Sequence, residues 1–260
     1  MSLRVLVTRP QAQASSTVAA ISAQGHQVLP MPCLEIVPVV SDSDQGQVNK
    51  FLAMDLDAYA HVIVVSTNAV ACFLPLVEDY WPQWPHAQTW WAMGATTQAA
   101  LQAADIPQVQ RAAAGETSED LLQGLLPLMK TGDKVLIVRG LGGRETLAQA
   151  LEEQGVKVDY AQCYSRQAPQ LSSHDIAQVQ AFDPQVVVLQ SGETLLNFEA
   201  SLSAHLDTTN SSMHLLLPSE RVMTMAQELG YQHCLLSAGA SDQAICHTLS
   251  QYEVRIAGQL

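Results

Sequence analysis

The stretch KVLIVRGLGGRETL, from Lys134 to Leu147, decides the fold class. Its four consecutive apolar residues at 135–138 are typical of a strand that is covered on both faces of a parallel sheet. A glycine-rich turn follows, and the apolar spacing beyond it predicts a helix over 145–154, which Gly155 would end. The stretch is therefore a strand, a turn and a helix, which is the building unit of α/β proteins.

The glycine-rich turn is suited to an anionic ligand. Gly140 and Gly142 let the backbone approach a ligand closely, and the helix N-terminus behind them offers N–H groups to an anion. A dinucleotide fingerprint would need a third glycine where Glu145 stands, and no Gly-Lys-Ser/Thr of a P-loop follows. Two interpretations stay open: a tight turn without a ligand, or a turn that holds an anion through its amides together with Arg139 and Arg144.

The composition is that of an acidic globular protein. With 260 residues, 48% of them apolar, the chain can bury a sizeable core. Twelve basic and 25 acidic residues give a net charge of −13, which repels nucleic acid and anionic membrane surfaces. No apolar run approaches the roughly 18 residues of a membrane span, and the chain does not begin with a basic and then apolar leader. We therefore expect a cytoplasmic protein with neither nucleic acid nor membrane as a partner.

Several kinds of chemistry lack their sequence signatures. The eight histidines and five cysteines show no HExxH or CxxC spacing, so we expect no metal site and reduced, mostly buried cysteines. A Gly-x-Ser-x-Gly elbow and a suggestive Cys–His pair are also missing, which argues against a covalent nucleophile.

A repeat runs through the chain. The opening strand and helix return after a shift of 130, which places Arg9 on Arg139, and a shift of 125 places Ser66 on Ser191. The matches keep their order, which indicates two similar α/β lobes. Alternating strands and helices predict doubly wound parallel sheets, whose ligands lie beyond the carboxyl ends of the strands. We expect two such edges to face a shared cleft.

Extended segments interrupt both halves of the repeat. After the second predicted strand of each half, 31–40 and 161–169 stay extended, and prolines disfavour a helix in the first of them. We interpret them as linkers between the lobes. The acidic, helix-poor segment SDSDQ at 41–45 would mark the entry into the second lobe.

Candidate ligand contacts are the polar residues and glycines that follow the predicted strands. Many of the Ser, Thr and Asn residues would also be helix N-caps, and capping is compatible with ligand binding because both use the same helix ends. Five arginines at turns or linkers, Arg166 among them, would suit an acidic ligand. The candidates are Arg9, Ser66, Thr67, Asn68, Gly94, Thr97, Ser118, Arg139, Gly140, Gly142, Arg144, Ser191, Gly192, Ser219, Arg221 and Gly239.

One side chain stands out as a proton donor. Tyr164 falls in the second linker, where its phenol could face the cleft. The other interpretation of Tyr164 is an ordinary packed strand tyrosine.

Taken in order along the whole chain, these motifs resemble the uroporphyrinogen-III synthase family, and its bacterial branch in particular. No single motif is decisive, but their order and spacing together are specific. They are VTRP (7–10), STNAV (66–70), GATT (94–97), TSEDLL (117–122), LIVRGLGGRE (136–145), CYSR (163–166), QSGE (190–193) and PSER (218–221).

The resemblance implies a fold of two flavodoxin-like, doubly wound parallel-sheet lobes joined by a two-stranded linker. Lobe 1 would be discontinuous, combining 1–36 with 169–260, and lobe 2 would hold 41–160, with linkers at 37–40 and 161–168. Where many members carry a Gly-x-Thr-Thr type of turn in the last lobe, this chain has PSER. The resemblance therefore implies that Arg221 replaces a threonine contact there.

The activity that the resemblance implies is ring closure without a cofactor. Hydroxymethylbilane carries eight carboxylates, loses its terminal hydroxyl as water, and cyclises with inversion of ring D through a spiro intermediate to uroporphyrinogen III, for heme and siroheme synthesis. Uncatalysed closure gives the type I isomer, so the enzyme must select a geometry. The chain would be a monomeric hydro-lyase that receives its substrate from hydroxymethylbilane synthase in a transient hand-over, with Tyr164 as the proton donor.

Two other classes of protein share some of these features. A bilobal small-anion-binding protein without catalytic activity would have the same repeat and cleft. A nucleotide- or flavin-binding α/β protein is disfavoured by the missing glycine fingerprint and by the few aromatic residues at strand ends.

Overall fold

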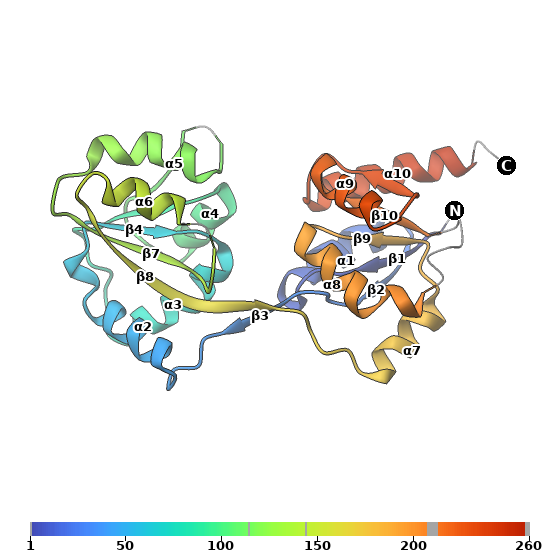
Figure 1. The fold of residues 1–260 in the computed structure, drawn as a ribbon, viewed down its shortest axis with the longest axis horizontal. Coiled ribbons are helices and arrows are strands. Elements are labelled where there is room, and N and C mark those ends of the chain that lie inside the picture. Colours follow the sequence, from blue (N-terminus) through green and yellow to red (C-terminus); the bar gives the residue numbers. More distant parts are fainter. Residues whose placement is uncertain (1, 114, 144, 207–212, 258–260) are drawn as a thin grey trace. The chain divides into compact units, whose positions relative to one another are not determined.

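The chain forms two α/β units. The structure is a computed structural model that describes residues 2–113, 115–143, 145–206 and 213–257. Unit 1 combines Met1–Glu35 with Gln167–Leu260, and unit 2 is Ile36–Arg166 (Figure 1). The chain thus passes between the units twice, once at the start of strand β3 (Glu35–Pro38) and once at the end of strand β8 (Lys157–Gln167).

Unit 2 is built on a six-stranded sheet in the order β3-β8-β7-β4-β5-β6. From β8 to β6, each strand pairs in parallel with its neighbour, as expected when a helix follows nearly every strand. The other elements are α2 (Asp44–Met54), η1 (Leu56–Ala58), β4 (His61–Val64), α3 (Thr67–Glu78), β5 (Thr89–Ala92), α4 (Ala95–Ala103), β6 (Val109–Arg111), α5 (Ser118–Leu125), η2 (Leu126–Leu128), β7 (Lys134–Gly140) and α6 (Thr146–Glu152).

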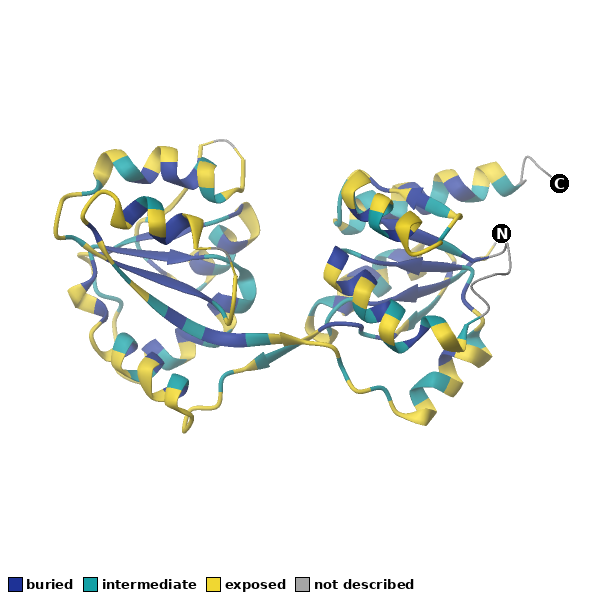
Figure 2. Ribbon diagram, viewed as in Figure 1, coloured by how far each residue is buried: buried dark blue, intermediate teal, exposed yellow. Residues whose placement is uncertain are grey.

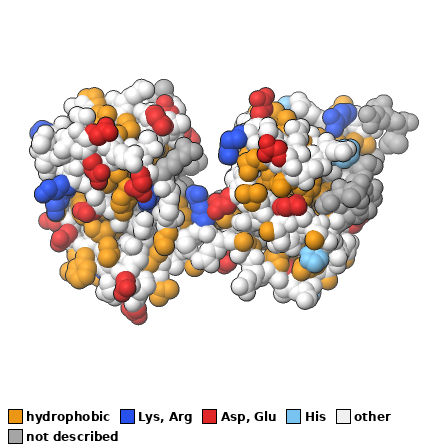
Figure 3. Space-filling view, viewed as in Figure 1, with side chains coloured by type: hydrophobic (Ala, Val, Ile, Leu, Met, Phe, Trp, Pro, Cys, Tyr) orange, Lys and Arg blue, Asp and Glu red, His pale blue; other side chains and the backbone are white. Residues whose placement is uncertain are grey.

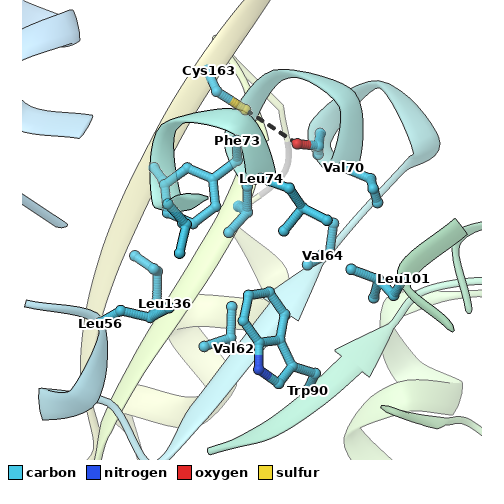
Figure 4. Packing of buried hydrophobic residues seen from close by; sticks show 14 of the residues in the cluster. Leu56, Val62, Val64, Val70, Phe73, Leu74, Trp90, Leu101, Leu136 and Cys163 are labelled. Carbon is cyan, nitrogen blue, oxygen red and sulfur yellow. Dashed lines mark hydrogen bonds between the residues drawn. The ribbon is translucent and has the colours of Figure 1, made fainter. Parts of the chain in front are cut away.

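Helices cover both faces of this sheet, so its central strands are buried on both sides (Figure 2). On one face, Phe73 of α3 and Leu101 of α4 pack with Val62, Val64 and Trp90 of the strands (Figure 4). On the other face, leucines of α5 and α6 pack on alternate strand residues. The continuous apolar run in β7 follows from this double cover, because residues that point to either side of the strand meet a helix.

Unit 1 is built on a five-stranded parallel sheet in the order β11-β10-β9-β1-β2. Leucines and valines of α7, α8 and α9 cover one face, and apolar residues of α1 and α10 cover the other. The elements are β1 (Arg4–Val7), α1 (Gln11–Ala23), β2 (Gln27–Pro30), α7 (Ser173–Phe182), β9 (Val186–Val188), α8 (Gly192–Ser201), η3 (Ser203–His205), β10 (His214–Leu217), α9 (Glu220–Glu228), β11 (Cys234–Leu236) and α10 (Asp242–Ala257).

The internal repeat places matching strands at matching positions in the two sheets. β1 corresponds to β7 and β9 to β4, so the order β2-β1-β9-β10-β11 in unit 1 is repeated as β8-β7-β4-β5-β6 in unit 2. Both orders are flavodoxin-like. In each sheet the order in which the chain adds strands changes side once, between β1 and β9 in unit 1 and between β7 and β4 in unit 2. The predicted α/β class with two doubly wound parallel sheets is confirmed. Ligand sites in such folds lie at the carboxyl ends of the strands where the order reverses.

Three local predictions were wrong. β8 is one strand of 11 residues, whereas the sequence suggested a short strand and then a separate linker. The acidic segment 41–45 contains the start of α2, because the Ser43 hydroxyl accepts a hydrogen bond from the Gly46 amide and caps the helix. The helix predicted over 145–154 is the shorter α6, which begins at Thr146.

Candidate functional site

In unit 2, the reversal of strand order between β4 and β7 brings two hydroxyl groups together. Ser66 follows β4 and caps α3, with its Oγ accepting a hydrogen bond from the Ala69 amide at 3.1 Å. The same Oγ lies 3.0 Å from the hydroxyl of Tyr164, which comes from β8, and the two share a hydrogen bond. Ser66, Thr67 and Asn68 are half-buried at this helix end. The structure therefore joins Ser66 and Tyr164, which lie 98 positions apart.

A bulge between β7 and β8 determines where Tyr164 points. The pairing register shifts between Arg139 and Gly140, so that Gly140 faces Tyr164. A Cβ atom on Gly140 would lie 2.7 Å from the Tyr164 ring. The ring fills the space that we assigned to a ligand over Gly140, and that prediction was wrong. Glycine is needed at position 140 because any larger side chain would collide with the Tyr164 ring.

Tyr164 is packed, with 1% of its surface exposed. Its ring belongs to the core between α3 and the sheet, where Cys163 and Val70 also lie (Figure 4). Of the two interpretations of Tyr164, the structure supports the packed strand tyrosine for its ring, and its role as a proton donor stays a prediction. Its hydroxyl alone reaches the half-buried Ser66 at the end of β4.

The glycine turn after β7 is open at Gly142. This residue has a φ of +69°, and a Cβ atom added to it would meet nothing within 4 Å, so the turn is accessible and requires glycine. The Leu141 amide is used internally, since it donates to the Tyr164 carbonyl at 2.7 Å. Arg144 lies outside the described residues.

Arg139 does not reach out from the turn. Its side chain is folded back, leaving the residue 7% exposed, and Nη2 donates to Oε1 of Glu145 at 2.8 Å. The guanidinium also lies over the Tyr160 ring, 4.2 Å from its centroid. The prediction that Arg139 presents its charge to a ligand was wrong, because a buried guanidinium is stabilised by pairing inside the protein.

A carboxylate already occupies the N-terminus of α4. The Ala95 amide donates to Oε1 of Glu116 at 2.9 Å, and a Cβ on Gly94 would lie 2.9 Å from the Glu116 carboxyl carbon. Gly94 therefore leaves room for an anionic group. The group found there is a carboxylate of the chain itself, and the contact of Gly94 with a ligand stays a prediction. Thr97 is buried. The hydroxyl of Thr117 caps α5, and Ser118 is the first residue of that helix, so its ligand contact stays a prediction.

In unit 1, two helix ends border a pocket of about 400 Å³. Ser191 caps α8 and Ser219 caps α9, each through a hydrogen bond from a backbone amide. The exposed Arg221 lines the pocket, and its neighbour Met225 would lie 2.9 Å from a Cβ on Gly192. The lining residues are Ser191, Gly192, Glu193, Leu196, Asn197, Arg221 and Met225.

Arg9 is held inside unit 1. It pairs with Asp242 at 2.9 Å and donates to the Thr17 hydroxyl at 2.8 Å and to the Ala240 carbonyl at 3.0 Å. Its predicted contact with a ligand is not supported by this geometry, because it already donates hydrogen bonds to Thr17 of α1 and to the start of α10. Nearby Gly239 has a φ of +123° with open space around it.

Three side chains that contact these turns are absent from the candidate set: Glu116, Glu145 and Tyr160. Glu145 ends the quoted motif LIVRGLGGRE and Glu116 directly precedes TSEDLL, but only the fold shows which backbone or cation they face. Tyr160 lies in none of the quoted motifs or turns, so nothing in the sequence indicates its contact with Glu145. On the face shown in Figure 3, acidic side chains are spread over both units.

Within the described residues, no three His, Cys, Asp or Glu side chains are grouped as metal ligands. None of the helices in the described part of the chain combines the length and apolar character of a membrane span.

Comparisons with known proteins agree with one another. The family model described as "Uroporphyrinogen-III synthase HemD" matches residues 15–246. The uroporphyrinogen-III synthase of Escherichia coli K12 is 30% identical over 255 residues, covering 95% of this chain and all of that protein. The enzyme of the same name from Salmonella typhimurium LT2 is 28% identical over 256 residues, with 95% and 100% covered.

Two solved structures share the fold. A mutant uroporphyrinogen III synthase from Thermus thermophilus gives a TM-score of 0.60 at 14% identity, covering 99% of this chain and 100% of that one. The uroporphyrinogen-III synthetase of Helicobacter pylori 26695 gives 0.62 at 15% identity, covering 97% and 99%. The family model and the relatives span nearly the whole chain, and the chain belongs to the uroporphyrinogen-III synthase family.

Proposed function

We propose that the chain catalyses closure of hydroxymethylbilane to uroporphyrinogen III, with loss of water and inversion of ring D. The observation that carries this proposal is the family match over residues 15–246. The reaction makes the chain a lyase, and it needs no cofactor, because the substrate closes by itself to the type I isomer. The enzyme's task is then to orient the flexible chain before it closes.

Helix N-termini at the strand ends hold the substrate's carboxylates in this proposal. The Glu116 carboxylate on the Ala95 amide supports it, because it occupies one such end at 2.9 Å. Each helix end contributes roughly 0.3–1 kcal/mol toward a bound anion, and more where the end is partly buried. The side-chain and glycine contacts proposed at these ends are Ser66, Thr67, Asn68, Gly94, Gly142, Ser191, Gly192, Ser219, Arg221 and Gly239.

Tyr164 is the proposed proton donor. Its phenol gives a proton to the terminal hydroxyl of the bilane, the C–O bond breaks, and water leaves. The freed methylene carbon then bonds to the substituted α-carbon of ring D, which gives the spiro intermediate. The bond from that carbon to the neighbouring methylene bridge breaks and re-forms at the free α-carbon of ring D, which inverts the ring, and that carbon releases the proton that restores the phenol. Ser66 supports this role, because its hydroxyl holds the Tyr164 hydroxyl at the carboxyl end of β4.

We also propose a division into two lobes, a monomeric state and a source of the substrate. The lobes are 1–36 with 169–260 and 41–160, with linkers at 37–40 and 161–168, and the unit boundaries at 35/36 and 166/167 support this division. The protein acts in the cytoplasm as a monomer. It receives its substrate from hydroxymethylbilane synthase by transient hand-over, which limits spontaneous closure to the type I isomer.

The direct test is the product isomer ratio. The purified protein, without added metal or cofactor, should convert hydroxymethylbilane mainly to uroporphyrinogen III. Chromatography of the oxidised products measures the ratio of isomer III to isomer I against a reaction without enzyme. Equal ratios in the two reactions would exclude the proposed function.

A second test addresses the open glycine turn. Gly142→Val should weaken binding of uroporphyrin III, the stable oxidised product, by roughly 10-fold or more, because its side chain covers amides that hold a carboxylate. Gly132→Val is a matched control, since Gly132 also has a positive φ (+93°) with open space around it but lies before β7, at the other end of that strand. Fluorescence titration gives both affinities. Equal losses in the two variants would mean that backbone strain, and not ligand contact, explains the effect.

A further inference from the structure

Three side chains form a cluster at the base of the glycine turn: Arg139, Glu145 and Tyr160. Glu145 accepts two hydrogen bonds, from Arg139 Nη2 at 2.8 Å and from the Tyr160 hydroxyl at 2.5 Å. Tyr160 also places its ring against the Arg139 guanidinium, with 4.2 Å between the guanidinium carbon and the ring centroid. Each member therefore contacts both of the others.

The protonation states favour this arrangement. The hydrogen bond from Tyr160, followed by that from Arg139, holds the pKa of the Glu145 carboxyl below its usual value, so Glu145 stays ionised. Burial and the Glu145 carboxylate raise the pKa of Tyr160 to about 12, so its hydroxyl keeps its proton and remains a donor. Pairing also offsets the cost of burying the Arg139 guanidinium.

The cluster connects the two ends of the glycine turn. Arg139 precedes Gly140, Glu145 follows the turn, and a Cβ on Gly143 would lie 4.0 Å from Arg139 Nη1. Gly142 and Gly143 have φ angles of +69° and +119°. Glycines lose more conformational freedom on ordering than any other residue, so an unclamped turn would lose that freedom each time a ligand bound.

We propose that Glu145 is a positioning residue, which holds the Gly140–Gly143 turn in the form that presents its open part, Gly142 and Gly143, to a substrate carboxylate. The inference rests on the proposed function for the identity of the substrate. Arg139 and Tyr160 support the turn through their hydrogen bonds to Glu145. Glu145 itself does not contact the reacting atoms.

The test compares Glu145→Ala with Glu145→Gln and with a matched control. Glu145→Ala should raise KM for hydroxymethylbilane, and Kd for uroporphyrin III, on the order of 10-fold while kcat stays within about twofold. Glu145→Gln should restore most of the affinity, because its carboxamide can still bond both partners. Glu199→Ala is the control, since Glu199 accepts an equally short hydrogen bond from Tyr231 in unit 1 and does not belong to the glycine turn after β7. Its KM and Kd should not change.

Each other result would contradict the inference. An unchanged KM in folded Glu145→Ala, or an equal rise in Glu199→Ala, would reduce the cluster to a general stabilising contact. Tighter binding by Glu145→Gln would mean that the Glu145 charge competes with the ligand. If Glu145→Ala does not fold, Tyr160→Phe replaces it, with an expected rise of about threefold. A wild-type protein that binds uroporphyrin III without making isomer III would exclude the proposed function and leave the Kd comparison valid.

Discussion

Replacing Tyr164 with phenylalanine should lower turnover about 100-fold and leave substrate affinity nearly unchanged. The ring still fills the space over Gly140, so packing is preserved. Only the hydroxyl is lost, together with its hydrogen bond to Ser66. If this hydroxyl donates the proton that lets water leave, its removal acts on the transition state and not on binding.

Steady-state kinetics on hydroxymethylbilane, with kcat and KM resolved, measures this effect. Tyr59→Phe is the control, because Tyr59 is another buried tyrosine of unit 2 whose hydroxyl donates a hydrogen bond, in this case to Asp159 at 2.8 Å. It should retain wild-type turnover. A Tyr164→Phe enzyme that is as fast as wild type would return Tyr164 to a packing role.

The second large effect is expected at Gly140. A methyl group there would lie 2.7 Å from the Tyr164 ring, which is surrounded by the core and cannot withdraw. Overpacking of this kind costs roughly 1–3 kcal/mol, so Gly140→Ala should lower the free energy of unfolding by that amount and disturb Tyr164 as well.

Urea unfolding gives the stability difference, and the activity assay gives the loss of turnover. Gly124→Ala is the control, because Gly124 lies in α5, where a Cβ would meet only Trp91 at an ordinary 3.8 Å. That variant should gain roughly 0.5–1 kcal/mol, since alanine is the better helix residue. A Gly140→Ala protein as stable as wild type would show that the ring has room to move.

The sequence predicts the sheets well because their signal is local. An apolar run such as 135–138 identifies a buried strand, and a serine before a helix identifies a cap, as for Ser66, Ser191 and Ser219. The matching of Arg9 with Arg139 also identifies equivalent strands, β1 and β7.

The sequence predicts the site less well because its contacts are not local. Asp242, which neutralises Arg9, lies 233 positions away, and no spacing rule connects the two. The bulge that turns Tyr164 inward depends on the pairing register of two strands, which apolar patterns do not specify to the residue. The strand-end position of Arg9 and Arg139 therefore predicts a ligand contact, whereas each of these arginines forms an ion pair inside its own unit.

The position of β1 between β2 and β9 has a consequence for synthesis on the ribosome. β1 pairs with β2 on one side and with β9 on the other, and β9 follows about 180 residues later. At roughly 5–20 residues per second, β1 waits on the order of 10–40 s for that partner. All of Ile36–Arg166 emerges in the interval and can fold as one continuous segment. The nascent chain thus carries an unpaired apolar strand edge at its N-terminus throughout, which is a surface for chaperones and a starting point for misassembly.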